Sequence, residues 1–299
     1  MLFYVAKKTN LWYINFTSIL RSRNLKTLFV SDLDGTLLTS EERISDYSLV
    51  RLNGLIDGGL TFTYATARSL NSAAKACWGL RQIFPVILYN GAVVMEPWSG
   101  KKLYNNHFND GQLAFLKELF QRFDVWPLVY SFHRGSERVS WVEGKETSGV
   151  LRYLSRRKGD GRLNPVRVRE DVAGDEIFYF TCIGKREDLE GVRQAVENSL
   201  DMRCIFEQET YQTDYWCEIM PRNTSKGAAA LAVKEYLKAD RLVAFGDGIN
   251  DISLFRAADE SYAVRNAVAE LKAVCTGEIG YSEEDGVVKF IMKNLGKYR

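Results

Sequence analysis

The chain has 299 residues, of which 46% are apolar and 26% are charged, so it is long enough for two domains and has the composition of a soluble globular protein. A net charge of +2 does not indicate a nucleic-acid partner. With only two histidines, a serine–histidine–aspartate triad or a histidine-rich zinc site is not expected. Five cysteines, an odd number, do not indicate a disulfide framework. We therefore expect reduced thiols in a cytoplasmic protein.

Residues 1–24 form an N-terminal extension whose role the sequence leaves open. They are basic, contain no acidic residue and include the aromatic run 11–20. This run is half as long as a transmembrane helix and is interrupted by polar residues, so we expect no membrane span. A targeting or membrane-surface segment is one interpretation. A plain extension ahead of the first domain is the other.

The stretch 27–38 is the one around which we expect the fold to be organised. An apolar run rich in β formers ends in Asp32 and Asp34, and Gly35 and Thr36 close it. This pattern predicts a buried strand that runs into a turn. Ligands of an open parallel sheet collect at the carboxyl ends of its strands, where both carboxylates would face a cleft. Two carboxylates this close need a positive partner, and a hard divalent cation such as Mg²⁺ is the simplest.

The following residues predict alternating helices and strands. We expect helices over 45–58 and 70–80 and strands over 60–65 and 85–89. Alternation of this kind indicates right-handed βαβ units and a parallel, Rossmann-like sheet. Each strand is followed by a polar residue, Thr66 after the second and Asn90 after the third.

A different pattern begins at residue 93 and predicts an inserted domain over 93–220. We expect helices over 110–123, 147–157 and 185–200, and strands over 126–133, 138–142, 176–183, 202–207 and 214–220. Helix–strand–strand units at both ends of the insert predict a separate antiparallel sheet with helices on one face. The fold class is therefore α/β, with a parallel core formed by residues 25–92 and 221–299 and an inserted α+β cap.

The insert also carries the one basic cluster of the chain, Arg152, Arg156, Arg157, Lys158, Arg162, Arg167 and Arg169. Most runs of this kind are solvated faces of helices and loops. The functional alternative is a surface that attracts an anionic substrate.

The core resumes after Pro221. Ser225 can cap a helix over 226–238 that opens with Lys226, and a strand over 241–245 runs into Gly246-Asp247-Gly248-Ile249-Asn250-Asp251. Four strands would then place acids, hydroxyl and amide groups and one lysine in a single cleft. This set suits a phosphomonoester, because phosphoryl transfer needs neutralised oxygens and a positioned nucleophile.

Four separate motifs resemble those of the haloacid dehalogenase-like (HAD) phosphohydrolases. Asp32-Leu33-Asp34-Gly35-Thr36 resembles motif I, Thr66 in Ala65-Thr66-Ala67-Arg68 motif II, Lys226 in Ser225-Lys226-Gly227 motif III, and residues 246–251 motif IV. The resemblance covers the chain from about Leu25 to the C-terminus. An insert between motifs II and III, preceded by Asn90-Gly91-Ala92, is similar to the Cof-type subgroup, whose α/β cap is called type IIB.

The resemblance implies a role for each acidic residue. Asp32 would be the nucleophile that forms an aspartyl-phosphate, and Asp34 would protonate the leaving alkoxide and then deprotonate the attacking water. Mg²⁺ would be held by the Asp32 carboxylate, the backbone carbonyl of Asp34 and Asp247, while Asp251 would orient the waters of the metal. The resemblance further implies that the phosphoryl oxygens are held by Leu33, Thr66, Ala67, Lys226 and Asn250, and that Asn90 lies at the cap-facing side of the site.

Three functions remain open at this stage. The sequence favours a Mg²⁺-dependent phosphatase of small phosphorylated metabolites such as sugar phosphates, nucleotides or cofactor phosphates. A phosphomutase would share the chemistry but return the phosphoryl group to its substrate. A non-catalytic protein that binds phosphorylated ligands or nucleic acid is supported only by the basic cluster and would not need Asp32, Asp34 and Asp247 together. Nothing in the sequence indicates the substrate or the oligomeric state.

Overall fold

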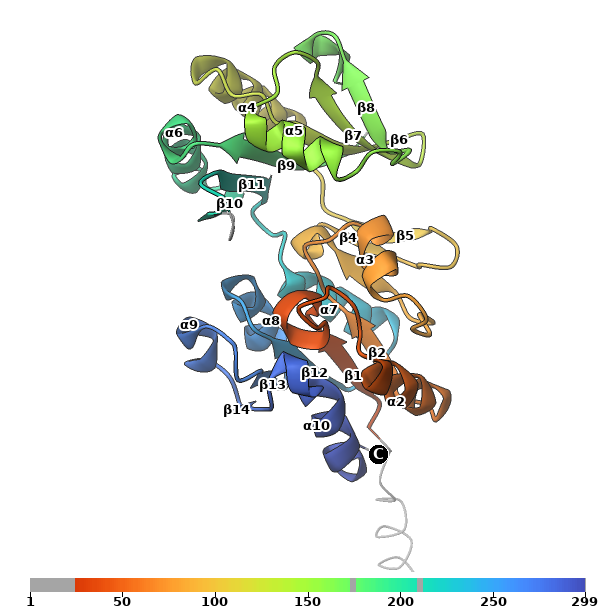
Figure 1. Ribbon diagram of the computed structural model, residues 1–299. Coiled ribbons are helices and arrows are strands. Elements are labelled where there is room, and N and C mark those ends of the chain that lie inside the picture. The colour runs from red at the N-terminus through yellow and green to blue at the C-terminus, as the bar shows by residue number, and fades with distance from the viewer. Residues whose placement is uncertain (1–24, 173–175, 209–211, 299) are drawn as a thin grey trace, which may run out of the picture.

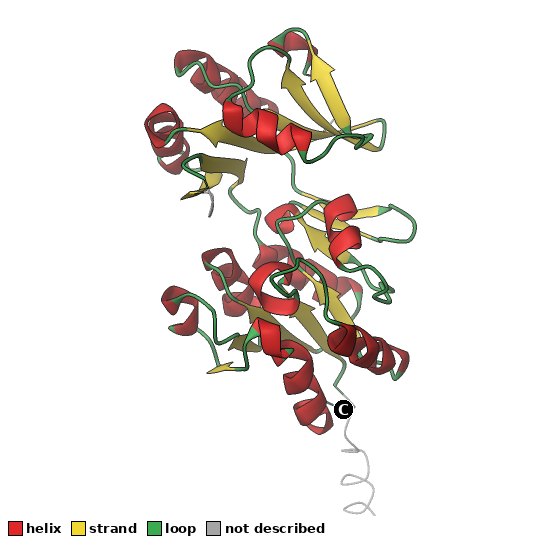
Figure 2. Cartoon of the chain, viewed as in Figure 1, coloured by secondary structure: helices red, strands yellow, loops and turns green. Residues whose placement is uncertain are grey.

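The computed structural model describes residues 25–172, 176–208 and 212–298. Figure 1 shows two bodies, a core that carries both ends of the described chain and an inserted domain that lies above it. Three sheets of five, six and three strands organise these residues, and helices flank them (Figure 2). The predicted α/β fold class is confirmed by this arrangement.

The core sheet is parallel and has the strand order β14-β13-β12-β1-β2. Its strands are β1 (Thr27–Ser31), β2 (Thr61–Tyr64), β12 (Arg241–Gly246), β13 (Glu260–Ala263) and β14 (Gly277–Glu278). All five side chains of β1 are buried, as expected for the central strand of a sheet covered on both faces. Ser31 pairs with Phe245, so β1 and β12 end side by side.

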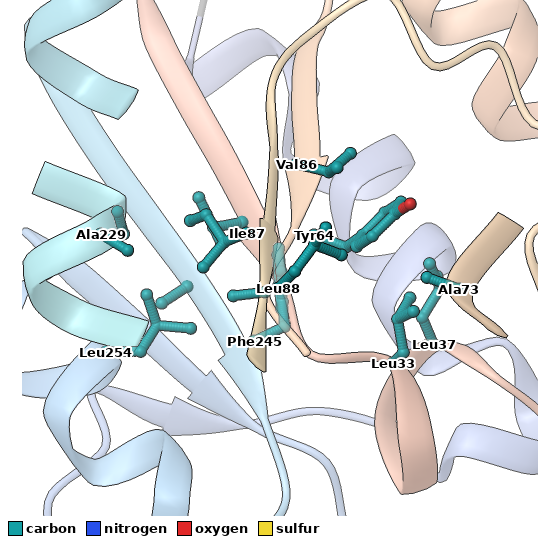
Figure 3. Close-up of a cluster of buried hydrophobic side chains, with 14 of the residues drawn as sticks. Leu33, Leu37, Tyr64, Ala73, Val86, Ile87, Leu88, Ala229, Phe245 and Leu254 are labelled. Atoms are coloured by element: carbon teal, nitrogen blue, oxygen red, sulfur yellow. The ribbon is translucent and has the colours of Figure 1, made fainter. Parts of the chain in front are cut away.

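Six helices pack around this sheet: α2 (Asp46–Asp57), α3 (Leu70–Ala76), α7 (Lys226–Tyr236), α8 (Ile252–Ala257), α9 (Ala269–Lys272) and α10 (Gly286–Asn294). The hydroxyl groups of Ser45, Ser69 and Ser225 cap α2, α3 and α7 by accepting a backbone N–H of the first turn. The buried apolar cluster joins residues from both segments of the core, such as Leu33 with Phe245 and Leu254 (Figure 3). The two segments therefore fold as one unit.

The third predicted strand does not join the parallel sheet. β3 (Val86–Leu88) pairs antiparallel with β4 (Val93–Met95), which pairs with β5 (Lys102–Asn105). An isolated parallel bridge between Ala65 and Ile87 is its link to the strand before it. The physical reason is the turn at Asn90 and Gly91, whose φ angles of 54° and 96° reverse the chain. The sequence assigns residues 93–105 to the insert, but in the structure they form a sheet with β3, the strand that precedes the insert.

The inserted domain has a six-stranded sheet in the order β10-β11-β9-β6-β7-β8. Its strands are β6 (Leu128–His133), β7 (Ser136–Val142), β8 (Leu163–Val166), β9 (Glu176–Gly184), β10 (Met202–Gln208) and β11 (Tyr215–Pro221). The sheet is antiparallel, as predicted, except that β7 and β8 are parallel.

The helices of the inserted domain lie on both faces of this sheet. On one face, α4 (Asp110–Arg122) and α6 (Arg186–Glu197) share a buried cluster with Val129. The next residue along β6, Tyr130, points to the opposite face, where its hydroxyl lies 2.9 Å from that of Tyr153 in α5 (Ser148–Ser155). The expectation that all helices share one face is wrong for α5, because its apolar side completes the face that is turned toward the core.

The two bodies are in direct contact. The ring of Tyr89, just after β3, lies 5.5 Å from that of Tyr130 and 5.1 Å from that of Phe178. Its hydroxyl donates to Glu137 and accepts from Arg162, both in the inserted domain. The two chain segments that cross between the bodies also touch, since Asn106 Nδ2 donates to Thr224 Oγ1 over 2.8 Å.

Three members of the basic cluster make contacts within the inserted domain. Arg152 pairs with Asp214, Arg162 pairs with Glu137 at 2.5 Å, and Arg169 donates to the carbonyl of Val125. These three side chains stabilise the fold of the inserted domain. The structure contains no helix in its described ranges that is long and apolar enough to cross a membrane, and the N-terminal extension lies outside these ranges.

Candidate active site

The site is built where β1 and β12 end. The N–H of Asp32 donates to the carbonyl of Phe245 over 2.9 Å, so the parallel ladder continues one residue past β1 and brings Asp32 next to Asp247. The carboxylates of Asp32, Asp247 and Asp251 each have an oxygen within 4.8 Å of the others. Sheet topology thus gathers acidic residues from two distant motifs at one point.

Lys226 holds this acidic group together. It opens α7 and is almost completely buried, with 1% of its surface exposed. Its ammonium group donates to Asp32 Oδ1 at 2.6 Å and to Asp251 Oδ1 at 2.7 Å. Close backbone packing fixes this helix end, because a Cβ on Gly91 would lie 2.2 Å from the carbonyl oxygen of Ser225. Only glycine at this position lets the turn after β3 approach so near.

Both carboxylate oxygens of Asp251 accept hydrogen bonds from other groups of the protein. Its Oδ1 accepts from Lys226, and its Oδ2 accepts the backbone N–H groups of Asp247 and Gly248 at 3.0 Å each. These bonds shape the loop after β12 and orient it. A carboxylate so occupied fits an orienting role better than direct ligation of a metal.

Asp247 is fixed by the turn after β1. Thr36 Oγ1 donates to Asp247 Oδ1 over 3.0 Å. Gly35, at φ 74°, allows the close approach of the two loops, because a Cβ there would lie 2.3 Å from Asp247 Oδ2. This oxygen faces the turn of motif I, next to Asp32.

Burial makes the charges of this cluster costly. It raises the pKa of Asp32 well above its ordinary value, and although Lys226 works against this rise, Asp251 adds to it. Burial and the neighbouring Asp251 raise the pKa of Asp247 to about 6. Burial alone would lower the pKa of Lys226, but the Asp251 and Asp32 carboxylates outweigh burial and raise it.

The donor set fits a hard divalent cation. Three ionised carboxylates and one ammonium group sum to a formal charge of −2, which one Mg²⁺ would cancel. Carboxylate oxygens are ligands that Mg²⁺ prefers. Asp32 Oδ2 and Asp247 Oδ2 accept no hydrogen bond from the described residues, so both oxygens are free to bind an ion.

Asp34 is placed differently from the other acids. Its carboxylate accepts two hydrogen bonds from Arg68, at 2.8 Å from Nε and 2.5 Å from Nη2. The Asp34 side chain is 51% exposed, whereas that of Arg68 is 17% exposed and also reaches Glu42. Arg68 therefore fixes Asp34 at the solvent side of the site.

The residues expected at the phosphoryl oxygens surround this cluster in different ways. Thr66 is fully buried, and its hydroxyl accepts the N–H of Arg68. Asn90 accepts from Asn250 Nδ2 over 3.1 Å, which joins the loops after β3 and β12. The side chain of Leu33 lies in the apolar core, and Ala67 is exposed just past β2, so only their backbone amides could contact a phosphate.

Three contributors to the site escaped sequence reasoning. Arg68 is the last residue of the motif II stretch, and a cation beside paired carboxylates was a signal that could have identified its role. Thr36 belongs to motif I, but its contact with Asp247 depends on the pairing of β1 with β12. Tyr179 of the inserted domain accepts a hydrogen bond from Asn90 at 3.0 Å, and no sequence spacing indicates that contact.

Sequence comparison places the chain among hydrolases. The model of a family described as haloacid dehalogenase-like hydrolase matches residues 29–291. A putative phosphatase of Haemophilus influenzae is 25% identical over 275 residues, which cover 89% of this chain and 96% of the relative. A 5-amino-6-(5-phospho-D-ribitylamino)uracil phosphatase of Bacillus subtilis is 23% identical over 276 residues, which cover 88% and 96%.

Solved structures share the whole fold, including the insert. A haloacid dehalogenase-like hydrolase from Bacteroides thetaiotaomicron superposes with a TM-score of 0.74 at 21% identity and covers 90% of this chain and 99% of its own. A sugar phosphatase of HAD subclass IIB gives a TM-score of 0.66 at 19% identity, with 91% and 99% covered. At these identities the likeness concerns the fold.

Proposed function

This chain belongs to the haloacid dehalogenase-like hydrolases, and from that premise we propose that it is a Mg²⁺-dependent phosphatase of small phosphorylated metabolites. The observation that carries the proposal is the group formed by buried Asp32, Asp251 and Lys226 and half-buried Asp247 at the ends of β1 and β12. A buried net negative charge is unfavourable in a structural role. It is useful where a cation and a phosphoryl group bind together.

In the first half of the proposed reaction, Asp32 is the nucleophile. The carboxylate of Asp32 attacks phosphorus, the ester P–O bond breaks, and the leaving alkoxide takes a proton from Asp34. Lys226 holds Oδ1 of Asp32, so the attacking carboxylate has one fixed orientation. The product of this step is an aspartyl-phosphate and a free alcohol.

In the second half, water replaces Asp32. Asp34, now ionised, takes a proton from the water that attacks phosphorus, and the bond between phosphorus and Asp32 breaks. Inorganic phosphate leaves, and both aspartates return to their starting states. Asp34 lies at the solvent side of the site, where it can exchange protons with the leaving group and with water. This position suits it for the role of acid and base.

The phosphoryl oxygens would be held by groups that already line the site. Lys226, Thr66 and Asn250, together with the backbone N–H groups of Leu33 and Ala67, are the donors that we assign to them. Mg²⁺ bound to Asp32 and Asp247, and to the backbone carbonyl of Asp34, would supply electrostatic stabilisation of the charge on the phosphoryl group. Asp251 would orient the loop that carries Asp247.

The inserted domain would act as the cap that selects the substrate. It covers the motif II loop and contacts the core through Tyr89 and Asn90. The named activity of the Bacillus subtilis relative supports a small phosphorylated metabolite as the substrate. All five cysteines are thiols in the structure, which supports a cytoplasmic location.

Replacing Arg68 with Met should lower kcat about tenfold or more, because Asp34 would lose the two hydrogen bonds that fix its carboxylate. KM should change less, since Arg68 acts on Asp34 and not on the phosphoryl group. Steady-state kinetics measures both constants. The matched control is Arg81→Met, which removes an exposed arginine paired with Asp57. A parental kcat for Arg68→Met would contradict the positioning role of this arginine.

The proposed function is tested by measuring phosphate release from several tens of phosphomonoesters, with Mg²⁺ and with a chelator. We expect release that requires the metal and is concentrated on a few related esters. Transfer of the phosphoryl group back to a substrate, without release, would indicate a phosphomutase. Binding of phosphorylated ligands with neither release nor transfer would indicate a non-catalytic protein.

A further inference from the structure

The inserted sheet ends in a long edge strand that nothing in its sequence protects. β10 is the last strand in the order of this sheet and has β11 as its one neighbour (Figure 1). It has seven residues, contains no proline and pairs with β11 without a shift of register. The other edge strands in the described ranges have two to four residues, and β8 also contains Pro165. A long edge without proline or a bulge is a template for pairing with a further strand.

The outer side of β10 carries backbone groups that are free to pair. The N–H of Arg222 donates to the carbonyl of Asp201 over 2.9 Å, which extends the ladder between β10 and β11 by one pair. Hydrogen-bonded and non-hydrogen-bonded pairs alternate along an antiparallel ladder, so the odd-numbered residues of β10 bond to β11. Pro221, which has no N–H, fits this pattern because it lies opposite even-numbered Met202. The N–H and carbonyl groups of the even-numbered residues therefore point away from the sheet, and no backbone group of the described residues bonds to them.

One face of β10 carries two opposite charges on either side of an isoleucine. Arg203, Ile205 and Glu207 alternate along the strand and share the face on which Ile205 packs against the larger apolar cluster. Glu207 is exposed, and Arg203 is half-buried and donates to the carbonyl of Thr224 over 3.2 Å. Neither charged side chain forms an ion pair within the described part of the chain. Burial lowers the pKa of Arg203, as expected for a cation that has no carboxylate partner.

This strand is complementary to a second copy of itself. An antiparallel pair centred on Ile205 places Arg203 opposite Glu207 of the second copy at both ends, with the two isoleucines between them. In this register the even-numbered residues of the two strands lie opposite each other, so their free backbone groups can exchange hydrogen bonds. A shift of two residues would be worse. In one direction it brings Glu207 opposite Asp201 of the second copy, and in the other it takes Arg203 past the end of the strand.

We propose that the protein forms a two-fold symmetric dimer in which the β10 strands of two copies pair antiparallel about Ile205 and join the two inserted sheets into one. Backbone hydrogen bonds hold the strands together, and the ion pairs between Arg203 and Glu207 of the second copy fix their register. The pairing also covers the edge at which the chain would otherwise aggregate. This interface lies on the inserted domain and does not depend on the reaction that the core catalyses.

Sedimentation velocity of the full chain tests for the dimer, over a range from low micromolar to the highest soluble concentration. We expect a reversible equilibrium between one and two chains, because a two-fold interface uses the same edge of both copies and is then closed. A monomer at every concentration would overturn the proposal and leave the edge to a strand of another protein. Growth into assemblies larger than two chains would also overturn it.

Charge reversal tests the register. Arg203→Glu and Glu207→Arg each place like charges opposite each other at both ends of the interface, so each should raise the Kd of the dimer about tenfold or more. An equal mixture of the two variants restores opposite charges at both positions and should form a heterodimer with a Kd near that of the parent. Glu118→Arg, at an exposed site of α4, is the matched control and should keep the parental Kd. Circular dichroism checks that the variants are folded. An unchanged Kd in both variants, or no association of the folded mixture, would overturn the proposal.

A disulfide cross-link tests the centre of the interface and needs no charge variant. The two copies of Ile205 would form a non-hydrogen-bonded pair, whose Cα atoms lie about 4.5 Å apart, within the range that a disulfide spans. Ile205→Cys, made together with Cys204→Ser, should therefore give a covalent dimer under mild oxidation, seen by gel electrophoresis without reductant. Leu200→Cys in the same background is the control, because Leu200 is 82% exposed near the same edge but lies five residues from the axis. No cross-link through residue 205, or an equal yield from the control, would overturn the proposal.

Discussion

Replacing Asp32 with Asn is expected to lower kcat by about 10⁴-fold or more, because the substitution removes the nucleophile and preserves the volume of the side chain. The remaining amide can still accept a hydrogen bond from Lys226 but cannot form the aspartyl-phosphate. Phosphate release on the best ester of the panel, followed over hours, measures the loss.

The fold should survive this change. Lys226 keeps its contact of 2.7 Å with Asp251, and the variant removes one of three carboxylates whose burial is unfavourable. The melting temperature in the absence of metal should therefore equal or exceed that of the parent. Asp46→Asn, at an exposed residue in the first turn of α2, is the matched control and should change neither activity nor stability. Turnover by Asp32→Asn at the parental rate would rule out the mechanism.

Replacing Lys226 with Met should reduce the free energy of unfolding by about 3–5 kcal/mol, because it leaves the buried carboxylates of Asp32 and Asp251 without a cation. Activity should be lost as well, since Asp32 would no longer have a fixed orientation. Urea unfolding measures the loss of stability. Lys234→Met on the same helix is the control, and removal of its partly exposed pair with Asp259 should cost less than about 1 kcal/mol.

The origin of this loss can be checked with metal and with pH. Mg²⁺ should restore part of the stability of Lys226→Met, because the ion would neutralise the same carboxylates. Acid should help in the same way. The pKa of Asp247 is raised from 3.8 to about 6 in the folded protein, so this carboxyl holds its proton more tightly there than in the unfolded chain. Its contribution to stability therefore increases as the pH falls from about 6 toward 3.8. A deficit independent of both metal and pH would indicate lost packing in place of uncompensated charge.

The core strands could be predicted from the sequence because their signals are local. β1 and β12 are short apolar runs, each followed directly by acidic residues and glycine, and both are buried where they were expected. Their parallel pairing followed from the alternation of strands and helices. The gathering of Asp32, Asp247 and Lys226 depends only on this pairing and on the start of α7.

The features that the sequence did not predict depend on contacts between distant residues. The sequence of β3 is typical of a buried parallel strand, but the turn at Asn90 makes it pair with β4. No local sequence signal indicates which strand pairs with β3. The face to which α5 binds depends on how the inserted sheet is turned toward the core. The contact of Tyr179 with Asn90, which joins the two bodies, likewise exists only once both are folded.

The contact between Asn106 and Thr224 has a consequence for the history of the chain. The two segments that enter and leave the inserted domain lie side by side at the core surface, so a short linker could join them. The two chain ends at the insertion point already lie close together. A folded unit inserted there therefore adds little to the entropic cost of loop closure when the core folds. A descendant of this gene could exchange the whole insert for another and keep the metal site intact. New substrates would then arise by recombination of a module and not only by stepwise substitution.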